Sequence, residues 1–100
     1  MVSRAVKVSL RRVHLRIHGL VQGVSFRACA RDEALRVKVS GWIRNLDDGD
    51  VEAVAEGAPD DVDLFVRWCN DGPPHAEVES VTLSDEESAT GEFSSFEVVR

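Results

Sequence analysis

Apolar and polar residues alternate near the start of the chain with the period of a strand. Between residues 12 and 19 every second position is apolar: Val13, Leu15 and Ile17. A period of two predicts a strand with one buried face. Beyond Ser25 the apolar positions step by four, four and three, as on one face of a helix: Phe26, Ala30, Ala34 and Val37. Ser25 suits the N-cap of this helix.

The strand pattern returns over residues 39–46 and again from Val51 to Ala55, and the dipeptide Asp48-Gly49 between them favours a tight hairpin. A second helix is predicted to begin at Pro59, because proline and the two aspartates after it suit a helix N-terminus. Its apolar positions have helical spacing: Val62, Phe65, Val66 and Cys69. The helix is expected to close at residues 71–74, Asp-Gly-Pro-Pro. Two further strands are expected at residues 77–83 and 93–99, on either side of a polar stretch.

This order of elements predicts an α+β, ferredoxin-like sandwich. It is βαββαβ with an additional C-terminal strand, and we expect an antiparallel sheet with two helices on one face. One hundred residues make one domain and one site. We assign residues 12–100 to this domain and residues 1–11 to an N-terminal extension, either a loose segment or a short extra strand.

Charge is distributed unevenly along the chain. Residues 1–31 carry seven Arg or Lys and no acid, whereas residues 32–100 carry five bases and all eighteen acids, so that +7 and -13 give the net charge of -6. An acidic chain does not suit nucleic-acid binding, which needs a basic footprint. The basic stretch could attract one small anion, or its arginines could simply be solvated; charge alone leaves both interpretations open.

Cellular location and metal binding are constrained by a few residue types. No apolar run approaches the ~18 residues of a membrane span, so we expect a soluble protein and no membrane partner. Cys29 and Cys69 lack zinc or redox spacing, and no signal peptide is recognised, which predicts free thiols in the cytoplasm. His14 and His18 share one face of the first strand, but no Cys or carboxylate at ligand spacing accompanies them, so no metal site is predicted. Cys29 is expected to be a helix-packing residue, with redox sensitivity as the alternative.

The turn between the first strand and the first helix is a candidate anion site. A helix N-terminus leaves backbone N–H groups without partners, and its dipole favours an anion. Gly19 and Gly23 would allow these groups to converge. Arg27 lies in the first helical turn, where its guanidinium could form two parallel bonds to the same anion. Glycine at such a turn is also common without any ligand, so the spacing alone does not decide.

Two motifs resemble the signatures of the acylphosphatase family. The segment Gly19-Leu-Val-Gln-Gly-Val-Ser-Phe-Arg27 matches Gly-x-Val-Gln-Gly-Val-x-Phe-Arg at every fixed position. The segment Gly41-Trp-Ile-Arg-Asn45, followed by Gly49, matches the second signature with only Ile43 in place of Val. The resemblance covers about residues 12–100, in the same order of elements.

The resemblance implies a hydrolase that splits acyl phosphates into carboxylate and phosphate, without metal or cofactor. Arg27 would bind phosphate together with loop N–H groups, and Asn45 would orient the attacking water. The implied phosphate-binding residues are Leu20, Val21, Gln22, Gly23, Val24 and Arg27. The family further implies a small-molecule substrate, competitive inhibition by inorganic phosphate, and a monomer.

Three other functions are alternatives to acyl phosphate hydrolysis. The same fold could serve as a non-catalytic module that binds an anion or carbamoyl phosphate, since fold alone does not fix function. It also resembles the acylphosphatase-like domain of hydrogenase-maturation carbamoyltransferases. An RNA-binding sheet is disfavoured by the acidic charge and the lack of aromatic pairs. Leu46 and Arg100 depart from residues that some family members have there, which leaves the auxiliary contacts and the physiological substrate open.

Overall fold

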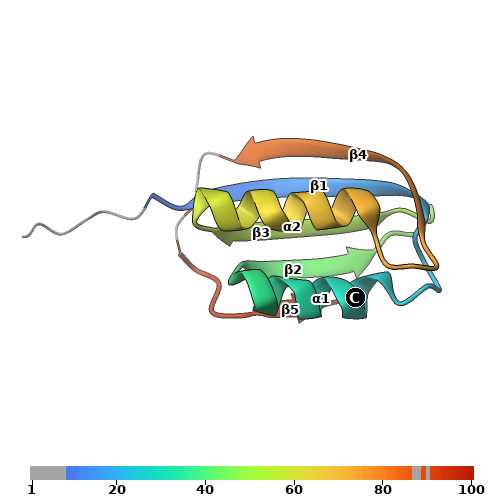
Figure 1. The fold of residues 1–100 in the computed structure, drawn as a ribbon, viewed down its shortest axis with the longest axis horizontal. Coiled ribbons are helices and arrows are strands. Elements are labelled where there is room, and N and C mark those ends of the chain that lie inside the picture. The colour runs from blue at the N-terminus through green and yellow to red at the C-terminus, as the bar shows by residue number, and fades with distance from the viewer. Residues whose placement is uncertain (1–8, 87–88, 90) are drawn as a thin grey trace, which may run out of the picture.

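Five strands and two helices make up the fold. The computed structural model describes residues 9–86, 89 and 91–100. In chain order the elements are β1 (Arg11–Leu20), α1 (Phe26–Val37), β2 (Ser40–Asn45), β3 (Val51–Gly57), α2 (Pro59–Asp71), β4 (Glu77–Glu86) and β5 (Phe96–Val98). This order confirms the predicted βαββαβ arrangement with an additional C-terminal strand (Figure 1).

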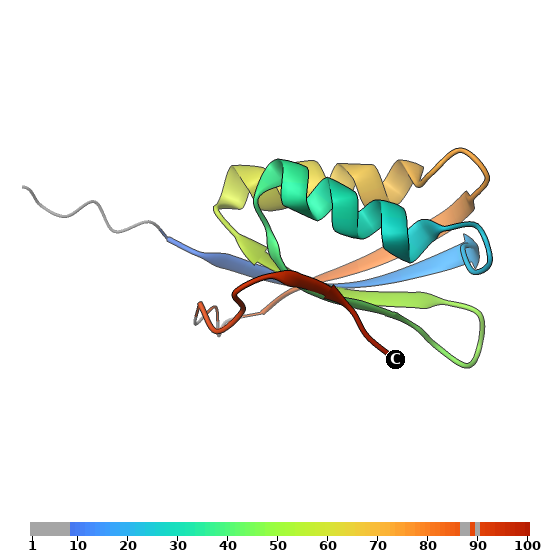
Figure 2. The same ribbon diagram turned by 90° about the horizontal axis from the view of Figure 1, so that it is seen from below.

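The strands form one sheet in the order β4-β1-β3-β2-β5, and both helices cover the same face (Figure 2). The first four strands pair antiparallel, as predicted. β5 pairs parallel to β2, so the sheet is mixed and the expectation of a wholly antiparallel sheet was wrong for this strand. The reason is the path of the chain. Because β4 ends beside the start of β1, at the end of the sheet where β2 also begins, a chain crossing there enters β5 in the direction of β2.

The core lies between the sheet and the helices. β1 contributes three residues that are fully buried, at the alternate positions that the pattern predicted: Val13, Leu15 and Ile17. The buried residues of α1 are those of the predicted helical face: Phe26, Ala30, Ala34 and Val37. α2 buries Val62, Phe65 and Cys69, and Val66 is partly buried against the same core. Burial of side chains such as Phe65 provides roughly 1.5–3 kcal/mol each, which fixes both helices on the sheet.

Both ends of α2 follow the sequence signals. α2 begins at Pro59 and ends at Asp71, and its C-cap residue Gly72 has a φ of 72°, which favours glycine. α1 ends at Val37, and the N–H of its C-cap residue Lys38 donates to the carbonyl of Ala34. Ser25 does occupy the N-cap position of α1, but its backbone is left-handed and its side chain forms no capping hydrogen bond. The prediction of a conventional serine cap was therefore wrong.

The ends of the strands differ from the sequence estimates. β4 continues to Glu86, because it pairs with β1 along its whole length, up to the pair Arg12 and Glu86. β5 is shorter than predicted and covers three residues. β1 starts at Arg11, and most of the proposed N-terminal extension, residues 1–8, lies outside the described residues, as do residues 87, 88 and 90 of the polar stretch. Among the described residues no helix is long and apolar enough to span a membrane.

Candidate active site

The loop between β1 and α1, residues 21–25, has the backbone of an anion-binding nest. Gly23 and Ser25 take positive φ values of 76° and 62°, with Val24 between them. Alternating signs of φ turn successive N–H groups toward one point, which suits an anion. A Cβ atom at Gly23 would meet nothing within 4 Å, so the loop is open at this position. The left-handed Ser25, which is unsuited to capping, thus helps to shape the loop.

Gly19 has a different role from Gly23. Its φ is 137°, and a Cβ atom there would lie 2.1 Å from the carbonyl oxygen of Glu77. The register between β1 and β4 shifts at this point. Gly19 therefore allows the end of β1 to approach β4 closely, and the loop begins from a fixed position.

The side chains of the predicted phosphate-binding loop point in several directions. Leu20 is the last residue of β1 and is 53% exposed, whereas Val21 is buried in the core. Val24 packs partly against the core as well. Val21 and Val24 could therefore reach a ligand only through their backbone, as the nest geometry requires.

Arg27 is the second residue of α1 and is half-buried. In the part of the chain that the structure describes, it has no carboxylate partner. At about 100° per residue, Arg27 and Cys29 lie roughly 200° apart around the helix axis, on opposite flanks. Cys29 faces α2, so Arg27 extends from the flank directed away from α2, where α1 runs beside β2 and β5 (Figure 1).

Asn45 is the last residue of β2 and pairs with Val51 across the hairpin. Its side-chain oxygen Oδ1 is buried and has no hydrogen-bond partner among the described residues. A buried amide oxygen without a partner costs free energy, and such atoms are rare in native proteins. The arrangement suits an oxygen that accepts a hydrogen bond from a small ligand or a water molecule.

The side chain of Gln22 joins the two halves of the candidate site. Its Nε2 donates to the carbonyl oxygen of Leu46 at 2.8 Å and to that of Asp50 at 2.9 Å. These carbonyls belong to the β2–β3 turn, which begins directly after Asn45. The loop and the turn lie at the same end of the molecule, which Figure 2 shows at the right. The structure therefore brings the two predicted motifs together.

The chain is similar to known proteins over most of its length. The family model described as Acylphosphatase matches residues 13–98. The acylphosphatase of Rubrobacter xylanophilus is 54% identical over 88 residues, which are 88% of this chain and 79% of that protein.

The chain belongs to the acylphosphatase family.

The solved structures show the same family relationship. The crystal structure of the acylphosphatase from Bacillus subtilis has a TM-score of 0.86 at 34% identity, covering 92% of this chain and 100% of that one. The acylphosphatase structure from Coxiella burnetii has a TM-score of 0.84 at 36% identity, over 90% of this chain and 93% of that one. The family expected from the two motifs and the ferredoxin-like fold expected from the order of elements are both confirmed.

Several other arginines of this acylphosphatase-family chain are paired with acids. Arg11 binds Asp63 and Asp85, at 2.5 and 2.7 Å. Arg12 binds the buried Glu56 at 3.0 Å. These contacts balance the charge of the basic stretch within the fold. Charge alone had left anion attraction and simple solvation open, and these two arginines instead form ion pairs.

The open face of the sheet, opposite the helices, continues this network toward the turn. Arg16 donates to Asp50 at 2.7 Å and also bonds Asp48, and His18 Nδ1 lies 2.7 Å from Asp50 Oδ1. Hydrogen bonds from Arg16 and His18 lower the pKa of Asp50, and the bond to Asp50 raises the pKa of His18. The turn that contacts Gln22 is thus held from the outer face by ion pairs.

His14 and His18 form ion pairs with carboxylates on the open face of the sheet. His14 pairs with Glu52 at 2.6 Å and His18 with Asp50, so both serve the ion-pair network. Within the described ranges no group of three or more His, Cys, Asp or Glu side chains could hold a metal ion. Cys69 is buried, and burial raises the pKa of its thiol.

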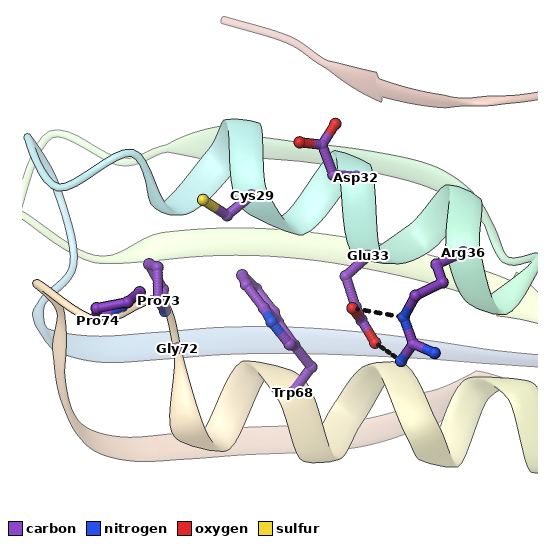
Figure 3. Close-up of a pocket in the computed structure, with 8 residues that line it drawn as sticks. All are labelled: Cys29, Asp32, Glu33, Arg36, Trp68, Gly72, Pro73 and Pro74. Atoms are coloured by element: carbon purple, nitrogen blue, oxygen red, sulfur yellow. Dashed lines mark hydrogen bonds and ion pairs between the residues drawn. The ribbon is translucent and has the colours of Figure 1, made fainter.

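A groove of about 310 Å³ lies between the two helices, apart from Arg27. Figure 3 shows Cys29 and Trp68 facing one another across it, with the ion pair of Glu33 and Arg36 farther along α1. The ring of Trp68 also packs against Phe26 at a centroid distance of 5.3 Å. Cys29 is thus a partly buried free thiol on the wall of this groove.

Sequence reasoning missed the side-chain role of Gln22. The backbone of the loop was expected to bind phosphate, and the amide was given no task of its own. The sequence did hold a signal for this role. The family motif requires glutamine at this position, whereas a residue that contributes only its backbone N–H could have almost any side chain.

Proposed function

We propose that this protein is an acylphosphatase, which hydrolyses the carboxyl-phosphate bond of acyl phosphates to a carboxylate and inorganic phosphate. One observation carries the proposal. Arg27, which has no carboxylate partner in the described part of the chain, and Asn45, whose Oδ1 has no partner there, belong to segments that Gln22 ties together. The membership of the acylphosphatase family supports the same activity.

Arg27 binds the phosphate of the substrate in this mechanism. A guanidinium can form two parallel bonds to phosphate oxygens, and backbone N–H groups of Leu20, Val21, Gln22, Gly23 and Val24 surround the same anion. The N-terminus of α1 adds its positive dipole end. The open space above Gly23 admits the ligand.

Asn45 holds the nucleophile. A water molecule donates one hydrogen bond to Asn45 Oδ1, which leaves a lone pair directed at phosphorus on the side opposite the leaving carboxylate. The water oxygen bonds to phosphorus, the bond from phosphorus to the carboxylate oxygen breaks, and the water protons pass to the phosphate and to solvent. Because a carboxylate leaves readily, positioning and charge stabilisation suffice without a strong base.

Further properties follow from this mechanism. Inorganic phosphate competes with substrate, since it retains the group that the loop binds. The residues named need no metal or cofactor and recognise a small molecule rather than a nucleic acid. We propose a monomer located in the cytoplasm, where the free thiols Cys29 and Cys69 stay reduced.

Phosphate release from benzoyl phosphate tests the proposal. The purified protein should hydrolyse benzoyl phosphate equally well with and without a chelator, and should be far slower on p-nitrophenyl phosphate, a monoester with a poorer leaving group. Tight binding of phosphate or carbamoyl phosphate without hydrolysis would instead favour a non-catalytic binding module of the same fold.

A further inference from the structure

Within the described residues, the amide of Gln22 makes the only side-chain link between the loop that follows β1 and the β2–β3 turn. Its two Nε2 hydrogens go to two different carbonyl oxygens, those of Leu46 at 2.8 Å and Asp50 at 2.9 Å. The same two residues close the turn, because the N–H of Leu46 donates to the carbonyl of Asp50 at 2.8 Å. Gln22 therefore binds the two residues that form the base of the turn.

Each end of this link is adjacent to a proposed functional group. Leu46 follows Asn45 directly in the chain, so a hydrogen bond that holds the Leu46 carbonyl also restrains the backbone of Asn45. On the other side Gln22 precedes Gly23, an open position of the loop, where a Cβ would meet nothing within 4 Å. A loop with glycine at an open position deforms easily unless a neighbouring contact holds it.

We propose that Gln22 is a positioning residue, which sets the distance between the phosphate bound at the loop and the water held at Asn45. This inference rests on the proposed acylphosphatase activity. Attack in line with the leaving group requires the water oxygen and phosphorus to be held within a narrow range, and a displacement of about 1 Å can cost roughly a hundredfold in rate. Gln22 controls that range through the backbone, without touching substrate by its side chain.

The chemistry of the site explains why glutamine is needed. Two neutral donor hydrogens on one nitrogen match two carbonyl acceptors, whereas a glutamate carboxylate would face both oxygens with negative charge. Methionine has nearly the same length and no donor. The turn keeps its shape without the link, because Arg16 binds Asp48 and Asp50 from the outer face. Loss of the link should therefore alter the relative placement of loop and turn while leaving both folded.

The test compares Gln22→Met with wild type and with a matched control. Ser40→Ala removes another half-buried bond from a side chain to a backbone carbonyl, that of Ser40 Oγ to Glu56 at 3.3 Å, on the same strand as Asn45 but at its other end. We expect Gln22→Met to lower kcat on benzoyl phosphate by roughly ten- to a hundredfold. The inhibition constant of phosphate should change by less than about threefold, since transition-state placement is lost and ground-state binding is kept. Ser40→Ala should match wild type in both quantities.

A second variant supplies a pH signature that a purely structural role would not give. In Gln22→Glu the carboxyl can donate one hydrogen bond only when protonated, so its kcat relative to wild type should rise as pH falls toward about 4.3, the usual glutamate pKa. This variant also decides the matter if Gln22→Met does not fold.

Three outcomes would overturn the inference. Wild-type kcat in Gln22→Met would show that the link is not needed. An equal loss of phosphate binding and kcat would place the Gln22 side chain, and not only its backbone N–H, in the anion site itself. A flat pH ratio for Gln22→Glu would exclude the donor role. If the wild-type protein itself fails to hydrolyse benzoyl phosphate, the proposed function falls together with this inference, whereas the other outcomes leave it intact.

Discussion

The two helices begin in opposite ways. α2 starts with Pro59 and has Asp60 and Asp61 in its first turn, where acids offset the positive end of the helix dipole. α1 has no acid in its first turn, and its N-cap residue Ser25 is left-handed. Instead it carries Arg27, which adds positive charge where helices usually place negative charge. The comparison teaches that α2 offsets the positive end of its dipole with its own acids, whereas α1 has none in its first turn, which suits the external anion that we propose there.

Removal of Arg27 should have the largest effect. We expect Arg27→Ala to lower kcat/KM on benzoyl phosphate by about a hundredfold to a thousandfold, through both a higher KM and a lower kcat, because the arginine binds phosphate in the ground state and the transition state. Steady-state kinetics of phosphate release measures this. Arg67→Ala, which removes an exposed arginine from α2, should leave both constants at wild-type values. Equal losses in the two variants would contradict a special role for α1.

Removal of Asn45 should have the next largest effect and a different kinetic form. Water positioning matters in the transition state, so Asn45→Ala should lower kcat by about a hundredfold and leave KM nearly unchanged. The control is Asn70→Ala in α2, which removes only a bond from Asn70 to the carbonyl of Val66. Near-wild-type turnover by Asn45→Ala would refute the role given to Asn45.

An acid added to α1 should make the two N-termini alike. Ala28 is exposed in the first turn of α1, so Ala28→Glu would place a carboxylate there as in α2. We expect the inhibition constant of phosphate to rise roughly three- to tenfold, because the new charge competes for the helix dipole. Ala28→Gln, which has the same shape without charge, is the control. Unchanged phosphate affinity in Ala28→Glu would show that the charge at this N-terminus is unimportant.

The smallest expected effect concerns His18, whose charge serves the fold rather than the ligand. Its pKa is raised by the hydrogen bond to Asp50, so the stability it adds is complete below the unfolded pKa of about 6.5 and is lost as pH rises through the higher folded value. The pKa of Asp50 is lowered, so the stability that its charge adds is lost only as the pH falls through that lowered pKa. Denaturant unfolding should show a larger stability difference between wild type and His18→Gln at pH 6 than at pH 8. A difference that grows from pH 6 to pH 8 would contradict the pairing.

Much of the fold could be predicted because burial imposes its period on the sequence. The alternation at Val13, Leu15 and Ile17 and the spacing from Phe26 to Val37 gave β1 and the buried face of α1 correctly. The direction of β5 could not be predicted, because it depends on where β4 ends in space. The left-handed Ser25 was missed because cap preferences describe isolated helix ends, and here the loop takes its shape from the residues around it.

The candidate site was predictable only in part, because it is assembled by contacts between segments that are distant in the sequence. The motifs name Arg27 and Asn45, but the contact between their two segments depends on the pairing of β2 with β3 and on the bonds of Gln22 to the turn between these strands. The ion pairs of the open face depend on strand register; the register of β1 against β3, for example, brings His14 close enough to Glu52 to pair with it. Contacts between distant segments leave little trace in local periodicity, so the sequence alone could not separate paired arginines from Arg27.

Calorimetric titration with inorganic phosphate tests most directly whether Arg27 at the start of α1 is the anion-binding group. Wild type and Arg16→Ala should bind phosphate equally, because Arg16 is engaged with Asp48 and Asp50 on the open face. Arg27→Ala should bind it at least about tenfold more weakly, as expected for the loss of a charge-assisted, two-bond contact. Equal phosphate affinity in Arg27→Ala and wild type would contradict the account.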